Sequence, residues 1–206
     1  MSSAPSVLCA VDLSGHSRKV MQHACAIAEH FRARLIGVTI APTKECLAAI
    51  ESDLRSFMGT VLPVNVGLQA EFQARLMNGS PAATILRIAH EEAVDLVVVG
   101  THGASGFRRN EFGSTTEGVL RHADIPVLVV PGTGSDLHSL DDRREIRDIG
   151  SVMAPIDFGP LSERDARIAS GIADTLGVPL VLVHVCAPVG GVADGGGTAV
   201  SSLTSR

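Results

Sequence analysis

Short apolar segments alternate along this chain with segments whose apolar residues recur at helical spacing, and no other feature limits the fold so strongly. The clearest apolar segment covers residues 95–100, Asp-Leu-Val-Val-Val-Gly. Segments that are apolar at consecutive positions fit strands buried on both faces. Such strands, alternating with helices, predict a parallel sheet with right-handed crossovers and helices on each side. The predicted strands cover residues 6–11, 35–40, 70–77, 95–100 and 125–130.

The segments between these strands carry helix signals. Ser80 can cap a helix and Pro81 is tolerated at its first position, so a helix is predicted to begin there. Thr43 can cap another helix, and a short helix is predicted over residues 114–122. The predicted inner faces are Val20, Met21, Ala24, Ile27, Ala28 and Phe31 in the first helix, Leu47, Ile50, Leu54, Phe57 and Met58 in the second, and Ala82, Ile85, Leu86 and Ala89 in the third.

The composition agrees with a globular α/β protein. Of the 206 residues, 45% are hydrophobic and 19% charged, which favours a packed core over disorder. Only 3% are aromatic, so Ala, Val, Leu and Ile must build that core. The net charge of −5 and the scattered basic residues argue against nucleic acid as the primary partner.

The cysteines and the amino terminus predict an intracellular protein. Cys9, Cys25, Cys46 and Cys186 lie far apart in the sequence, so reduced thiols in the core are favoured over disulfides or a zinc site. Residues 1–5 carry no positive region or long apolar stretch. No segment approaches the roughly 18 apolar residues of a membrane span. We therefore expect a cytoplasmic protein with no membrane partner.

Two loops of the predicted sheet should form a binding site. Ligands of open α/β sheets bind beyond the carboxyl ends of the strands, where the winding direction reverses. The loops that follow the first and fourth strands, at Asp12 and Gly100, should meet at that point. A carboxylate facing this crevice is costly to leave unpaired, so a binding role is predicted for Asp12.

A spaced glycine pattern follows the fourth strand. Gly100-Thr101-His102-Gly103 is followed after nine residues by Gly113-Ser114-Thr115. Glycines let backbone N–H groups approach a phosphate, and the two hydroxyls and a helix N-terminus add donors and a favourable dipole. The alternative is that these glycines only permit a tight loop.

The pattern differs from the common phosphate-binding loops. The chain has no G-x-x-x-x-G-K-[ST] motif, its only lysines are Lys19 and Lys44, and its glycines do not form G-x-G-x-x-G. Arg108 and Arg109 lie between the glycines, where pairing with phosphate and an ordinary solvated loop are equally good interpretations. We favour structural roles for two histidines, His102 in the loop and His122 near a helix C-terminus.

The pattern Gly100-x2-Gly103-x9-Gly113-Ser114 resembles the ATP-binding signature of the universal stress protein family. The resemblance extends over residues 6–131. It includes Ala10-Val-Asp12-Leu-Ser14, Gly79-Ser-Pro81 with Ile85, residues 95–103, and residues 119–131, in the family's order and spacing.

This resemblance implies an open, doubly wound, five-stranded parallel sheet of order 3-2-1-4-5, of the adenine nucleotide alpha hydrolase-like type. It implies that Asp12 and the neighbouring backbone of Ala10 and Val11 contact adenosine, and that Ile40 packs beside adenine. The implied ligand is ATP, or ADP or AMP, with Mg²⁺ as an optional companion. The implied dimer pairs through the last strand, residues 126–130. The residues implied for ribose and phosphates are Gly100, Thr101, Gly103, Gly113, Ser114 and Thr115.

Three functions follow from these observations. The first is a nucleotide-binding sensor or regulatory module in stress response. The second is an ATP hydrolase or an adenylyl or phosphoryl transferase, which ranks lower because the glycine loop has no nearby lysine, acidic pair or general base. The third is a dimerisation scaffold that does not bind nucleotide.

The chain then begins to repeat itself. Residues 152–157, Val-Met-Ala-Pro-Ile-Asp, resemble residues 7–12, and a predicted helix with Ile168, Ile172 and Leu176 leads to a strand over residues 180–185. The predicted organisation is a family domain over residues 1–132, a charged linker over 133–150, a partial second repeat over 151–188 and a disordered tail over 189–206. The resemblance is to tandem family members, with a truncated second repeat.

Overall fold

The computed structural model describes residues 4–61, 68–101, 112–132, 150–186 and 199–205. They belong to two compact units, residues 1–146 and 147–206. The predicted linker, residues 133–150, lies outside the described residues except for Gly150.

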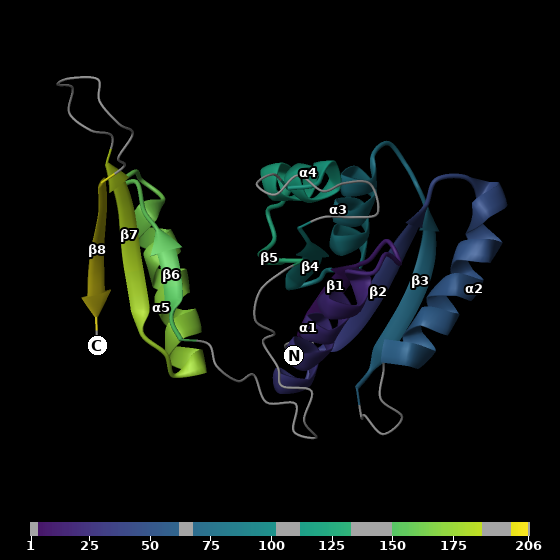
Figure 1. The fold of residues 1–206 in the computed structure, drawn as a ribbon, viewed down its shortest axis with the longest axis horizontal. Helices are drawn as coiled ribbons and strands as arrows, with labels where there is room; N and C mark the ends of the chain where they lie inside the picture. The colour runs from purple at the N-terminus through teal and green to yellow at the C-terminus, as the bar shows by residue number, and fades with distance from the viewer. Residues whose placement is uncertain (1–3, 62–67, 102–111, 133–149, 187–198, 206) are drawn as a thin grey trace. The chain divides into compact units, whose positions relative to one another are not determined.

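The first unit is the predicted α/β sheet (Figure 1). All neighbouring strands are parallel, in the order β3-β2-β1-β4-β5, which confirms the fold class expected from the sequence. The winding direction reverses between β1 and β4, so the carboxyl ends of these strands flank the switch point. The elements are β1 (Ser6–Ala10), α1 (Ser17–His30), β2 (Arg34–Ala41), α2 (Lys44–Val61), β3 (Ala70–Leu76), α3 (Pro81–Glu91), β4 (Leu96–Gly100), α4 (Ser114–His122) and β5 (Val127–Val130).

Two aliphatic cores cover the two faces of this sheet. Side chains alternate along each strand, so Cys9 faces α1 and α2 while Leu8 faces α3 and α4. The predicted inner face of α3 is buried throughout. In α2 only Leu54 and Met58 are fully buried, and Phe31 at the end of α1 is exposed. The core therefore consists mainly of small aliphatic side chains, as the composition predicts.

Gly37 allows an aromatic ring to cross the middle of β2. A Cβ built at Gly37 would lie 2.3 Å from Cδ1 of Phe72 on β3. The two residues are direct partners in the β2–β3 ladder. Any side chain at position 37 would displace the ring, so glycine is required here for packing.

The start of α3 follows the predicted capping pattern. The Ser80 hydroxyl accepts a hydrogen bond from the Ala83 amide at 3.1 Å, and Pro81 occupies the first turn. The buried Thr84 hydroxyl accepts from the Asn78 amide at 2.8 Å. These bonds fix the loop that leads from β3 into the helix.

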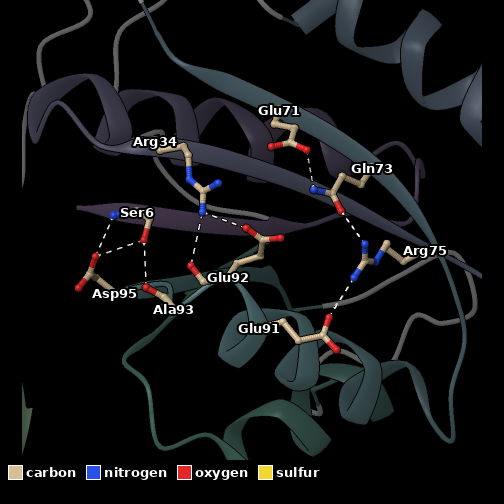
Figure 2. A network of polar contacts seen from close by, with 9 residues as sticks. All are labelled: Ser6, Arg34, Glu71, Gln73, Arg75, Glu91, Glu92, Ala93 and Asp95. Atoms are coloured by element: carbon tan, nitrogen blue, oxygen red, sulfur yellow. Dashed lines mark hydrogen bonds and ion pairs between the residues drawn. The ribbon is translucent and has the colours of Figure 1, made fainter. Parts of the chain in front are cut away.

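Polar contacts tie the amino ends of three strands together (Figure 2). The Ser6 amide donates to Oδ2 of Asp95 at 2.8 Å, which joins the start of β1 to the start of β4. Arg34 at the start of β2 pairs with Glu92 at 3.0 Å, and Figure 2 shows a second cluster around Arg75. These half-exposed ion pairs contribute up to about 1 kcal/mol each. The contacts of Ser6 and Arg34 lie at the opposite end of the strands from the switch point, whereas Arg75 lies near the carboxyl end of β3.

The second unit contains β6 (Val152–Pro155), α5 (Ser162–Leu176), β7 (Leu180–Cys186) and β8 (Ala199–Ser205). Its sheet has the order β6-β7-β8, with β6 and β7 parallel and β8 antiparallel to β7. The predicted strand–helix–strand repeat is therefore present. Its register equals that of the first unit: Val7 pairs with Leu35, and Val152 pairs with Leu180, each 145 positions later.

The structure differs from the prediction of a disordered tail over residues 189–206. Residues 199–205 form β8, while residues 187–198 lie outside the described residues. The reason is that the outer edge of β7 offers backbone N–H and C=O groups, which any extended segment can pair with whatever its side chains are.

The helix of the second unit is packed less completely than its sequence suggests. Ile168 and Ile172 are 50% and 48% exposed, whereas Ala169 and Ala173 are buried against the sheet. No helix in the described part of the chain combines the length and the apolar character that a membrane-spanning segment needs.

Candidate functional site

A pocket of about 280 Å³ lies at the switch point of the first unit. It is open between the ends of β1 and β4 and is covered on one side by the first turn of α4. Its walls come from six elements, β1, α1, β2, α3, β4 and α4, and from the adjoining loop residues. The lining residues are Ala10, Val11, Asp12, Ser17, Val20, Val38, Ile40, Pro81, Ile85, Val99, Gly100, Gly113, Ser114, Thr115 and Thr116.

Asp12 is held by the turn that joins β1 to α1. Its Oδ1 accepts a hydrogen bond from the Ser14 amide at 3.0 Å and another from the Ser17 hydroxyl at 2.9 Å. Leu13, which lies between Asp12 and Ser14, adopts a positive φ of 61°, and this conformation closes the turn tightly. Asp12 itself is exposed, while Ser17 is only 3% exposed. A buried hydroxyl thus orients a carboxylate at the mouth of the pocket.

The amino terminus of α4 forms the opposite wall. Gly113 is its N-cap, with a φ of −61° and no side-chain cap, and its amide donates to the Thr101 carbonyl at 2.8 Å. The Thr116 hydroxyl donates to the Gly100 carbonyl at 2.5 Å. These bonds tie the first turn of the helix to the end of β4. Amides in a first turn have no partner within the helix, and together with the helix dipole they attract an anion.

Apolar side chains line the space between these two polar walls. Val38 and Ile40 share one face of β2, and Pro81 and Ile85 share one face of α3. Val99 of β4 completes this surface. A pocket with an apolar wall, a carboxylate at one end and a helix N-terminus at another can take a ligand that combines a flat apolar group, hydroxyls and an anionic group.

Eight of the ten predicted site residues line this pocket. They are Ala10, Val11, Asp12, Ile40, Gly100, Gly113, Ser114 and Thr115.

Thr101 does not line the pocket. Its hydroxyl accepts a hydrogen bond from the Gly132 amide at 3.1 Å, and its backbone bonds Val130 and Gly113, so it joins β4, β5 and α4. The remaining predicted residue, Gly103, lies outside the described residues, as do His102, Arg108 and Arg109.

Sequence reasoning missed seven lining residues, and some of them carried a usable signal. Val38 lies two positions before Ile40 and must share its strand face. Pro81 and Ile85 share one helix face by their spacing, but neither was a predicted site residue, so that spacing alone did not place them in the pocket. Thr116 had no such signal, because its role depends on the position of the Gly100 carbonyl in space. The missed residues are Ser17, Val20, Val38, Pro81, Ile85, Val99 and Thr116.

Other titratable groups have structural surroundings. The Nδ1 of His122 donates to the Gly118 carbonyl at 2.9 Å within α4, in keeping with the structural role predicted for it. Burial, and then the neighbouring Cys25, raise the pKa of the Cys9 thiol well above its ordinary value. Cys46 is half-exposed, so the prediction of a core position fails for it. Among the described residues, no group of three or more His, Cys, Asp or Glu side chains could hold a metal ion.

The second unit repeats the carboxylate turn. Oδ1 of Asp157 accepts from the Gly159 amide at 2.7 Å and from the Ser162 hydroxyl at 2.7 Å, and Phe158 has a positive φ of 60°. The hydroxyl of Ser162, followed by the Gly159 amide, lowers the pKa of Asp157. The surroundings differ, because Asp165 stands at the position of Val20 in the pocket wall. This turn therefore has a more acidic environment than its counterpart.

Comparisons with known proteins agree on one family. The model of the universal stress protein family matches residues 67–131. Universal stress protein Slr1230 of Synechocystis is 32% identical over 122 residues, which cover 59% of this chain and 41% of that protein. Universal stress protein MJ0531 of Methanocaldococcus jannaschii is 29% identical over 131 residues, covering 58% of this chain and 77% of that protein. The chain thus matches about two fifths of the length of Slr1230.

Solved structures show the same fold. A universal stress protein crystallised in complex with cAMP aligns with a TM-score of 0.53 and 26% identity, over 64% of this chain and 100% of that chain. Universal stress protein UspA from Lactobacillus plantarum aligns with a TM-score of 0.51 and 22% identity, over 63% of this chain and 99% of that chain.

Proposed function

The chain belongs to the universal stress protein family, and we propose that the pocket of its first unit binds an adenine nucleotide, with ATP preferred over ADP and AMP. One observation carries this proposal: Asp12 and the N-terminus of α4 line a single pocket with an apolar wall between them. The cAMP complex of the related structure supports an adenine nucleotide as the ligand class.

Each part of the nucleotide has a complementary wall. The adenine would pack against Val38 and Ile40, where a flat apolar ring buries aliphatic surface. The Asp12 carboxylate would accept hydrogen bonds from the ribose hydroxyls. The phosphates would lie at the first turn of α4, where backbone amides and the Ser114 and Thr115 hydroxyls can donate.

We assign the bound nucleotide a regulatory role in stress response rather than a catalytic one. Transfer or hydrolysis of a phosphoryl group needs cations on the phosphates and a positioned water or acceptor. The described walls of the pocket contain one ionisable side chain, Asp12, and no lysine or arginine. Mg²⁺ would accompany the nucleotide through its phosphates. Slow ATP hydrolysis and a scaffold without nucleotide are the alternatives that experiment must separate.

We further propose that the protein is a cytoplasmic homodimer. β5 is an edge strand of the sheet, so its outward N–H and C=O groups can pair with the same strand of a second copy. Cys9 and Cys25 are buried in the core and form no disulfide, which suits a reducing compartment.

The decisive experiment measures the nucleotide content of the purified protein. The protein is denatured, and the supernatant is assayed for adenine nucleotides; titration calorimetry with ATP, ADP and AMP, with and without Mg²⁺, follows on nucleotide-free protein. We expect bound adenine nucleotide or ATP affinity in the micromolar range. An empty protein that also ignores added nucleotide would support the scaffold. Phosphate release at about 1 s⁻¹ or faster would support the enzyme instead.

A further inference from the structure

We infer that Gly118 is a positioning residue for the nucleotide pocket, because its contact with Ala82 fixes the spacing between α3 and α4. This inference rests on the proposed nucleotide binding. Gly118 lies one turn beyond the pocket on α4, and Ala82 lies in the first turn of α3. Neither residue lines the pocket itself.

The two helices pack side by side over one face of the sheet (Figure 1). A Cβ built at Gly118 would lie 2.8 Å from the Cβ of Ala82, closer than two carbon atoms can approach. Ala82 is only 7% exposed, and its short side chain cannot turn aside. The methyl group of Ala82 on α3 packs against Gly118 of α4, which has no side chain. This contact therefore sets how closely the two helices approach.

Each helix carries a different wall of the pocket. Pro81 and Ile85 on α3 supply apolar surface, while Ser114 and Thr115 on α4 supply the anion-binding end. Ala82 directly follows Pro81, and Gly118 lies one turn after Ser114. A shift at the contact is thus transmitted to both walls over a single helical turn.

Neither helix can absorb that shift without breaking other contacts. The start of α3 is fixed by the Ser80 cap and by Thr84, and Val119 of α4 is fully buried in the core next to Gly118. The Thr116 hydroxyl holds the first turn of α4 to the end of β4. A larger residue at position 118 must therefore tilt α4, and the first turn of α4 moves relative to Pro81.

The test is a size exchange between the two helices in the full chain. Gly118→Ala should weaken ATP binding by about tenfold, measured by titration calorimetry. Adding Ala82→Gly in the same molecule leaves one methyl group at the contact, now on α4 instead of α3, and should restore the affinity to within about threefold of the original. Gly59→Ala, also within a helix of the first unit but with nothing within 4 Å of the added Cβ, should leave the affinity unchanged.

Thermal melting of each variant separates positioning from folding. Alanine favours helix over glycine, so Gly59→Ala should melt slightly higher than the original protein. Equal ATP affinity in Gly118→Ala and the original protein would overturn the inference, as would a loss that Ala82→Gly does not reverse. If the original chain binds no adenine nucleotide, the proposed function itself fails, and this inference fails with it.

Discussion

The Ser17 hydroxyl, almost fully buried, donates a 2.9 Å hydrogen bond to the exposed Asp12 carboxylate, and the same bond recurs between Ser162 and Asp157. A hydroxyl that donates to one carboxylate oxygen fixes the direction of the other. In the first unit this carboxylate lines the pocket proposed for nucleotide. Because the second unit contains the same hydrogen bond, Asp157 is a matched control in the same chain for each measurement on Asp12.

Asp12→Ala should lower ATP affinity about 10- to 100-fold, since a hydrogen bond to a charged group contributes roughly 1.5–3 kcal/mol. Ser17→Ala should cause a smaller loss, because Asp12 keeps its bond from the Ser14 amide. Titration calorimetry measures both. Asp157→Ala is the control and should bind ATP like the original protein; an equal loss in this variant would mean that the effect of Asp12→Ala is not specific to the first unit.

Gly113→Val should abolish measurable ATP binding while the first unit stays folded. The branched side chain would stand at the N-cap of α4, next to the amides proposed to hold the phosphates. Nucleotide content after denaturation and the far-ultraviolet circular dichroism spectrum are the two measurements. Unchanged affinity would mean that this loop does not contact phosphate.

Asp157 should titrate below an ordinary aspartate, and Ser162→Ala should raise its pKa, because the Ser162 hydroxyl is the largest cause of the lowering. A carboxyl whose pKa is lower in the folded than in the unfolded state adds stability above its unfolded-state pKa. That stability is lost as pH falls through the folded-state pKa. Carboxyl chemical shifts followed from neutral to acidic pH test this. A pKa unchanged by Ser162→Ala would contradict it.

Removal of residues 147–206 should leave the first unit folded, because its sheet and both of its cores are formed within residues 4–132. We expect the melting temperature of the first unit to change by less than about 3 °C. Differential scanning calorimetry of the full and shortened chains measures it. A fall of about 10 °C or more would mean that the second unit supports the first.

Val129→Pro should dissociate the proposed homodimer without unfolding the sheet. Val97 donates to the Pro126 carbonyl and Thr101 to the Val130 carbonyl, so the backbone of Val129 points away from β4, toward the open edge. Size-exclusion chromatography with light scattering should show a dimer for the original chain and a monomer for the variant. A dimer that survives the substitution would place the interface elsewhere.

Much of the fold follows from the sequence because local and global signals agree. The resemblance to the universal stress protein family implied the strand order. Both polar walls of the pocket could be predicted from the residues, since parallel topology brings Asp12 and Gly100 to one edge. The direction of the Thr101 hydroxyl could not, because it depends on where Gly132 lies in space. The exposure of Ile168 could not either, because helical periodicity says which residues share a face but not what covers that face.

The second unit repeats the first with a constant offset of 145 positions, so the Asp157 turn corresponds residue by residue to the Asp12 turn. Asp157 can therefore serve as an internal reference for measurements on Asp12. Both carboxylates accept the same two kinds of hydrogen bond, from a backbone amide two residues on and from a serine hydroxyl five residues on, although Asp157 has the more acidic surroundings. A ligand that binds only in the pocket of the first unit would shift the carboxyl resonance of Asp12 and leave that of Asp157 unchanged. A single NMR spectrum of one sample would then distinguish ligand binding in the pocket from a change in salt, temperature or buffer.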